Sequence, residues 1–288
     1  MRIMLFVPSY NDTKMAYEIA LQFLRNREIT RVLIIDDSDD AECRVIAGRI
    51  RNQKIDVVQR RRAGKWSAWK IALEAAREYD GRIEIDSDAE VEKADCLIAS
   101  LHENDLVTAY PNIVLPPRGL GRMIGLVYRG MHEDMKRIGR FSMGGQLIAL
   151  SKRTVNSLLV HGFFQEPVAS DDHVVALGAC VLGLKCATID CGLRVRLPLT
   201  LKEWIKFRSR HRGAIKRAEQ YVSLKTGEIT RTAQVSRSDF DLSYGYFVVN
   251  LVKSLKLLAP LVLLLFILGS ILPIENQTQW SRLKGERA

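Results

Sequence analysis

The chain has 288 residues, of which 47% are hydrophobic and 26% charged, a composition typical of a folded protein that excludes an intrinsically disordered one. This length accommodates one large α/β domain with an appendage, or two ordinary domains. The net charge of +10 indicates an anionic partner, such as nucleic acid, a lipid surface or a phosphate-bearing substrate. The five cysteines form no CxxC pair, which argues against a disulfide framework and a zinc site.

Short apolar runs alternate with helical patterns up to about residue 189. The predicted strands are Ile3–Val7, Val32–Ile35, Ile55–Val58, Ile83–Ile85, Leu106–Ala109 and Leu147–Leu150. The predicted helices span residues 13–25, 41–51, 66–79 and 171–182, with a basic loop and helix within 118–140. This alternation predicts right-handed crossovers and a mostly parallel sheet flanked by helices. Ligands of such sheets bind beyond the carboxyl ends of the strands.

The C-terminal region contains an apolar run of 18 uncharged residues between Lys256 and Glu275. A bilayer-spanning helix needs about 20 apolar residues, so this run is at the lower limit. Pro260 and Pro273 shorten its regular part, which leaves open a helix lying in the membrane interface, and a buried core helix is a third alternative. We favour a spanning helix, because a uniformly apolar run has no face for water. The first residues are too short in apolar content for a signal peptide, so we expect the large domain to be cytoplasmic.

Carboxylates follow two of the predicted strands. Asp86, Ser87 and Asp88 come directly after the strand that ends at Ile85. Because side chains alternate along a strand, Asp86 and Asp88 are expected on the same side. Two such carboxylates suit Mg²⁺ or Mn²⁺, which prefer oxygen ligands and bridge to a diphosphate. An acidic turn without a metal is the simpler alternative.

The second acidic group, Asp36 and Asp37, closes the strand that ends at Ile35. A carboxylate there can accept hydrogen bonds from a base or a ribose, although Asp is also favoured at turns and helix N-caps. No GxGxxG motif follows the first strand, which disfavours a dinucleotide site. Pro8 and Tyr10 stand there instead and offer an aromatic ring and backbone groups to a nucleoside.

Basic residues gather in two segments. Arg60, Arg61, Arg62 and Lys65 follow the third strand, and residues 202–217 hold seven Lys or Arg against one Glu. The guanidinium groups of the second segment suit phosphate oxygens. They could equally face anionic lipid, at about 1 kcal/mol per charge. The candidates for phosphate contact in this second segment are Arg208, Arg210 and Arg212.

Together these elements resemble the family 2 glycosyltransferases, which have the GT-A fold, over roughly residues 1–215. The matching pieces are VPSYND at 7–12, IIDDSDD at 34–40, RRRAGKWSAWKIAL at 60–73, IDSDAE at 85–90, GGQLIALSKR at 144–153, ASDDHVVALGACVLGLK at 169–185 and FRSRHRG at 207–213. The chain has no clear QxxRW motif, since Trp204 precedes the arginines, and this argues against processive polysaccharide synthesis.

The resemblance implies a role for each group of residues. Asp172 would be the catalytic base, with Asp171 beside it near the acceptor, and a helix start favours their ionised form. Plain N-capping is the alternative for this pair. Asp88, with Asp86, would hold Mg²⁺ or Mn²⁺. The implied donor-binding residues are Pro8, Tyr10, Asp36, Asp37, Lys65, Asp86, Ser87, Arg208, Arg210 and Arg212.

The expected protein is thus an inverting glycosyltransferase that takes a sugar from a nucleotide diphosphate to a membrane-associated acceptor, a polyprenyl phosphate or glycolipid. The expected organisation is a GT-A catalytic domain over 1–225, a linker and juxtamembrane segment over 226–250, a transmembrane or membrane-associated helix over 251–275 and a tail over 276–288. The alternatives are a sugar-nucleotide nucleotidyltransferase, although VPSYND is not Gly-rich, and a non-enzymatic membrane-docking protein. Nucleic acid is not an expected partner, because acidic clusters repel phosphate unless a metal intervenes.

Overall fold

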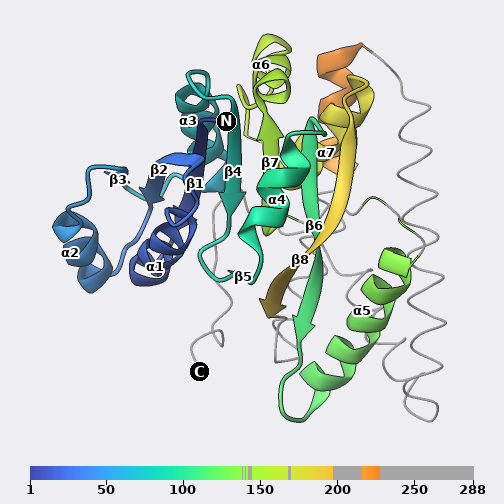
Figure 1. Ribbon diagram of the computed structural model, residues 1–288, viewed down its shortest axis with the longest axis horizontal. Coiled ribbons are helices and arrows are strands. Elements are labelled where there is room, and N and C mark those ends of the chain that lie inside the picture. Colours follow the sequence, from blue (N-terminus) through green and yellow to red (C-terminus); the bar gives the residue numbers. More distant parts are fainter. Residues whose placement is uncertain (138, 140, 142–144, 168–169, 197–215, 228–288) are drawn as a thin grey trace.

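A computed structural model of the protein describes residues 1–196 and 216–227, except 138, 140, 142–144 and 168–169 (Figure 1). Its elements in chain order are β1 (Ile3–Ser9), α1 (Thr13–Phe23), β2 (Ile29–Asp36), α2 (Ala41–Arg49), β3 (Ile55–Gln59), α3 (Lys65–Ala76), β4 (Gly81–Ile85), β5 (Glu90–Val91), α4 (Ala94–Leu101), β6 (Leu106–Val114), α5 (Leu120–Arg137), β7 (Leu147–Ser151), α6 (Lys152–Val160), α7 (Asp171–Val181) and β8 (Cys186–Arg196). A further helix covers residues 216–226.

The eight strands form one sheet in the order β3-β2-β1-β4-β7-β6-β8-β5 (Figure 1). Strands β1 to β4 run parallel, and so do β6 and β8, but β7 is antiparallel to both of its neighbours and β5 is antiparallel to β8. The sheet is therefore mostly parallel, as expected, since β1, β2, β3, β4, β6 and β8 run in one direction, and it is mixed because β7 and β5 run in the other. The carboxyl ends of β1, β2, β3 and β4 share one edge.

Helices cover both faces of this sheet, because the side chains of the buried strands alternate between two apolar clusters. Ile3, Leu5 and Val7 of β1 pack with α1 and α4, while Met4 and Phe6 pack with α3, α6, α7 and the helix over 216–226. Helix α1 buries one apolar face at helical spacing, formed by Ala16, Ile19, Ala20 and Phe23. The expected α/β architecture is confirmed.

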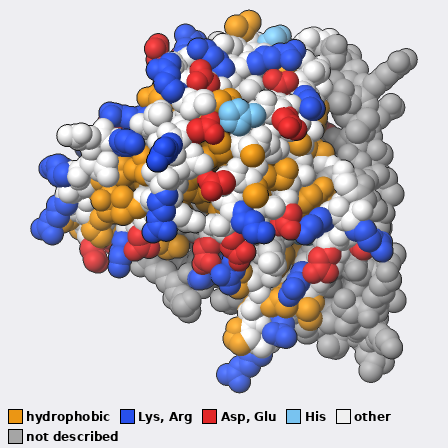
Figure 2. Space-filling model, in the orientation of Figure 1, with side chains coloured by type: hydrophobic (Ala, Val, Ile, Leu, Met, Phe, Trp, Pro, Cys, Tyr) orange, Lys and Arg blue, Asp and Glu red, His pale blue; other side chains and the backbone are white. Residues whose placement is uncertain are grey.

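The surface mixes both signs of charge. On the face shown in Figure 2, Lys and Arg side chains lie among Asp and Glu side chains and do not gather into one basic patch. The expected membrane segment over 251–275 lies outside the described residues, as do all but the first two residues of the expected linker over 226–250, the tail over 276–288 and residues 202–215 of the basic segment. Among the described residues, no helix has both the length and the apolar character that crossing a bilayer requires.

Candidate active site

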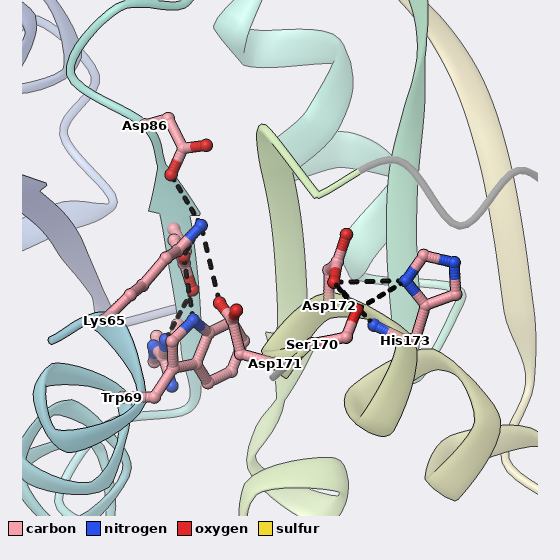
Figure 3. Close-up of polar contacts among 9 residues, drawn as sticks. Lys65, Trp69, Asp86, Ser170, Asp171, Asp172 and His173 are labelled. Carbon is pink, nitrogen blue, oxygen red and sulfur yellow. Dashed lines mark hydrogen bonds and ion pairs between the residues drawn. The ribbon is translucent and has the colours of Figure 1, made fainter. Parts of the chain in front are cut away.

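The candidate site is built around the ammonium group of Lys65, the first residue of α3 (Figure 3). Its Nζ lies 2.7 Å from Oδ1 of Asp86, 3.1 Å from Oε1 of Glu84 and 3.4 Å from Oδ2 of Asp171. The chain enters α3 through Gly64, whose φ of +83° is in the region that favours glycine. The ammonium of Lys65 thus brings together the end of β4 and the start of α7, which are far apart in sequence.

The charges at this site shift one another's proton affinity. Burial opposes the charged ammonium, but Asp171, Asp86 and Glu84 together raise the pKa of Lys65 well above its usual value. Burial raises the pKa of Asp86 to about 6, with a further rise from Asp88 and a partial offset from Lys65. The pKa of Asp171 is also raised, first by burial and then by the charge of Asp172. The site is thus rich in negative charge that one lysine offsets only in part.

Asp86 and Asp88 lie in a turn and not along a strand. β4 ends at Ile85. The amide of Ala89 donates a hydrogen bond of 3.1 Å to the carbonyl oxygen of Asp86, which closes the turn, and the amide of Asp86 donates one of 3.0 Å to the carbonyl oxygen of Gln146. We expected the alternation of side chains along a strand to place both carboxylates on one side. That argument does not apply, because the strand ends before Asp86. Ser87, predicted to contact the donor, is buried, and its Oγ donates to Oδ2 of Asp12 at 3.3 Å.

The acidic turn fits a divalent cation. Asp88 is exposed, Asp86 keeps 26% of its side-chain surface exposed, and the charge of Asp88 raises the pKa of Asp86. A cation between them would relieve that repulsion. Within the described part of the chain, no group of three or more His, Cys, Asp or Glu side chains is arranged to hold a metal. The fit is thus to a hard ion held by one or two carboxylates, with its other positions filled by phosphate oxygens and water.

Asp172 is held tightly by its neighbours at the start of α7 (Figure 3). Its Oδ1 accepts hydrogen bonds from Oγ of Ser170 at 2.6 Å and from the amide of His173 at 2.9 Å, and it lies 3.2 Å from Nδ1 of His173. Burial would raise the pKa of Asp172, but His173 and Ser170 outweigh it and lower the pKa well below its usual value. Ser170 makes no side-chain cap of α7, so its hydroxyl serves Asp172.

Gly145, which precedes β7, leaves room for the Asp172 carboxylate. A Cβ atom built on Gly145 would lie 2.4 Å from Oδ2 of Asp172 and 2.8 Å from its Cγ, closer than atoms can pack. The next residue, Gln146, accepts the hydrogen bond from the amide of Asp86 at 3.0 Å. Gly145 and Gln146 therefore contact the carboxylate of Asp172 and the backbone of Asp86.

Asp37 is occupied within the protein. Its carboxylate is 1% exposed and accepts two hydrogen bonds of 2.8 Å from the guanidinium of Arg60 and one of 3.0 Å from the amide of Gly64. Its predicted contact with a nucleoside would require these bonds to break. In this structure Asp37 instead anchors the loop that leads into Lys65. Burial raises its pKa, and Arg60 lowers it in part.

Asp36 is likewise buried, with an exposure of 1%, and its Oδ1 accepts from Oγ of Ser38 at 2.5 Å and from Oγ1 of Thr13 at 3.0 Å. It is therefore part of the packing between β2 and α1. Its expected contact with the donor is not available in this arrangement.

A separate, more accessible group lies beyond the ends of β1 and β2. The hydroxyl of Tyr10 donates to Oδ2 of Asp39 at 2.9 Å, and the guanidinium carbon of Arg62 lies 4.5 Å above the Tyr10 ring. Pro8 is buried within β1. Contact of Tyr10 with a nucleoside stays a prediction, and sequence reasoning missed Arg62 and Asp39 as its neighbours. Arg208, Arg210 and Arg212 lie outside the described residues.

Three buried residues beneath Lys65 were also missed. Arg82 is 0% and Glu84 1% exposed, and both contact Trp69 of α3. The alternation of charged and apolar residues in β4 is typical of a strand with one solvent face, so nothing in the sequence marked these charges as buried.

The chain matches no family model and no curated protein sequence. Solved structures do resemble it. Glucosyl-3-phosphoglycerate synthase from Mycobacterium tuberculosis, in complex with Mn²⁺, uridine diphosphate and glucosyl-3-phosphoglycerate, aligns with 80% of this chain and 81% of its own, at 20% identity and a TM-score of 0.50. The fold is shared with that synthase. GalNAc-T7 with UDP, GalNAc and Mn²⁺ covers 72% of this chain and 47% of its own at 15% identity, with a TM-score of 0.49. Mannosyl-3-phosphoglycerate synthase from Rubrobacter xylanophilus covers 80% and 77% at 17% identity, with a TM-score of 0.47.

Proposed function

We propose that this protein is a glycosyltransferase that moves a sugar from a nucleotide-diphosphate donor to an acceptor hydroxyl or phosphate, with Mg²⁺ or Mn²⁺ as cofactor. The observation that carries this proposal is the convergence of Asp86, after β4, and Asp171, at the start of α7, on Lys65. The fold supports it, because the synthase from Mycobacterium tuberculosis that shares it was solved with Mn²⁺ and uridine diphosphate.

The donor side of the proposed site comprises the acidic turn and the Tyr10 surface. Asp88 and Asp86 would hold the cation, which supplies positive charge for the diphosphate leaving group. The Tyr10 ring, with Arg62 4.5 Å above it, is a stacking surface of the kind that a nucleoside base uses. Asp37 contributes indirectly, by fixing Arg60 and the loop before Lys65.

The acceptor side of the proposed site is the start of α7. In an inverting transfer, the acceptor oxygen forms a bond to the anomeric carbon while the bond from that carbon to the diphosphate breaks, and a carboxylate takes the acceptor proton. We assign this role to Asp172. Its hydrogen bonds converge on Oδ1, and its lowered pKa keeps it ionised at neutral pH, so Oδ2 is the oxygen proposed to take the proton. Asp171 would orient the acceptor from beside it.

The acceptor class is proposed from the C-terminal part of the chain. The apolar run between Lys256 and Glu275 and the basic residues over 202–217 suit a protein that works at an anionic membrane surface. We therefore propose a membrane-associated acceptor, a polyprenyl phosphate or a glycolipid, and a catalytic domain on the cytoplasmic side.

A thermal unfolding titration tests the donor assignment. Mn²⁺ together with UDP or GDP should raise the midpoint more than either alone, since a ligand at 100 times its dissociation constant stabilises by about 2.7 kcal/mol. A donor screen with membrane lipid extracts, scored separately for sugar release and for transfer to lipid, then tests the reaction. A protein that only docks to membranes would show no shift with any nucleotide, and a nucleotidyltransferase would instead release pyrophosphate from a nucleoside triphosphate and a sugar phosphate.

A further inference from the structure

We propose that Glu84 is a positioning residue that, held by Arg82 and Trp69, fixes the ammonium of Lys65 between the donor-side and acceptor-side carboxylates. The positioning itself is a property of the fold, whereas its consequence for sugar transfer rests on the proposed function. The sequence pattern did not indicate a role for Glu84, Arg82 or Trp69 at the site.

The contacts of Glu84 use both of its oxygens. Oε1 accepts a hydrogen bond of 2.9 Å from Nε1 of Trp69 and lies 3.1 Å from Nζ of Lys65, while Oε2 accepts one of 2.9 Å from Nη2 of Arg82. Trp69 and Lys65 lie on successive turns of α3, four residues apart, and thus on the same face of the helix (Figure 3). The carboxyl group of Glu84 therefore connects the first two turns of α3 to β4 near its carboxyl end.

Packing alone does not explain the charges beneath Lys65. A buried ion pair costs several kcal/mol per ion in desolvation, and an apolar pair of similar volume often stabilises a fold as well or better. The guanidinium of Arg82 is moreover only partly satisfied, because its Nε and Nη1 have no hydrogen-bond partner among the described residues. It lies instead against two rings, 3.9 Å from the Trp69 ring centre and 4.8 Å from that of Phe6.

The carboxyl group of Glu84 is explained by its contact with Lys65. An ammonium has three N–H donors, and Lys65 has three carboxylate partners. Asp86 and Asp171 both lie where a ligand would contact them, and each is partly exposed, at 26% and 17%. Glu84 is 1% exposed and out of reach of a ligand. It is therefore the one of the three that keeps its contact with Lys65 when a cation binds Asp86 or an acceptor contacts Asp171.

Amine labelling tests the positioning without any assumption about the reaction. The protein is treated with an acetylating N-hydroxysuccinimide ester, and the rate at Lys65 is measured by peptide mass spectrometry relative to the exposed Lys70 of the same helix. We expect slow labelling of Lys65 in the native protein and labelling roughly tenfold faster in Glu84→Gln, the factor that loss of one charged contact implies. Glu84→Asp, which keeps the charge, should label at an intermediate rate.

Two further variants guard against a loss of folding. Arg82→Met combined with Glu84→Gln removes the cation that Glu84→Gln alone would leave unpaired, and it should also expose Lys65. Phe164→Leu is the matched control, because Phe164 stacks on Trp69 at 5.2 Å between ring centroids and belongs to the same apolar cluster. Its Lys65 should stay protected. Unchanged labelling in the folded Glu84 variants, or an equal rise in Phe164→Leu, would overturn the proposal.

The consequence for catalysis has its own readout. In the presence of Mn²⁺, the folded Glu84 variants should lose kcat with little change in KM for the donor, because the misplaced lysine affects the reacting geometry and not the nucleoside. If the native protein transfers no sugar while Lys65 labelling still depends on Glu84, the proposed function fails and the positioning stands. If transfer is intact and labelling does not depend on Glu84, the positioning fails and the function stands.

Discussion

The close approach of Gly145 to Asp172 gives the sharpest test of the acceptor side. In Gly145→Ala, the added methyl would lie 2.4 Å from Oδ2 of Asp172 and 2.8 Å from its Cγ. Relief of this overlap requires the carboxylate or the backbone to move by about 1 Å, the difference from an ordinary van der Waals separation of about 3.5 Å. Overpacking of this kind costs roughly 1–3 kcal/mol of stability. The φ of Gly145 is not in the left-handed region, so the backbone itself tolerates alanine.

We expect Gly145→Ala to lower the rate of sugar transfer by about 100-fold, because a misplacement of 1 Å at a reacting group costs roughly that factor. The thermal midpoint should fall by only a few degrees, and the stabilisation by Mn²⁺ with UDP or GDP should remain. Gly48→Ala is the matched control, since a Cβ at Gly48 of α2 meets nothing within 4 Å and should leave both quantities unchanged or slightly raise stability. Full transfer activity in Gly145→Ala would refute the assignment of Asp172 as the base.

Three further substitutions probe separate parts of the site. Asp172→Asn keeps the shape and one acceptor oxygen, so it should reduce transfer by at least about 100-fold while nucleotide binding, measured by calorimetry, stays close to native; a smaller loss would argue for another base. Asp88→Ala should abolish the part of the thermal shift by nucleotide that depends on Mn²⁺, and persistence of that part would place the cation elsewhere. Arg60→Met leaves the carboxylate of Asp37 buried without its cation, so the free energy of unfolding from urea titration should fall by about 3–5 kcal/mol; a loss under about 1 kcal/mol would show that water or another cation replaces Arg60.

The order of strands and helices could be read from the sequence wherever an apolar run was bounded by turn residues. The elements that were missed have other patterns. Helix α4 (Ala94–Leu101) and helix α6 (Lys152–Val160) are short and follow directly on a turn or strand. Strand β8 (Cys186–Arg196) alternates buried and partly exposed residues and contains Gly192, which weakens a strand pattern.

The direction of β7 could not be predicted, because strand polarity depends on the path of the chain between strands and leaves no mark in the apolar run Leu147–Leu150. The contact of Asp86 and Asp171 with one lysine could not be predicted from strand ends, because Asp171 begins a helix and its place beside the acidic turn depends on how α7 packs against α3. The burial of Asp37 could not be predicted, because it depends on the ion pair with Arg60. Arg60 directly follows β3, and nothing in the sequence indicates whether its side chain faces solvent or Asp37.

The residues directly before β7, Gly145 and Gln146, contact both the acidic turn at Asp86 and the start of α7 at Asp172. The carbonyl of Gln146 fixes the amide of Asp86, and the missing side chain of Gly145 provides the space that Asp172 fills. Because β7 is hydrogen-bonded to β4 on one side and to β6 on the other, it cannot slide without breaking both ladders. A shift of Gly145 and Gln146 would therefore displace the acidic turn and the proposed base at the same time.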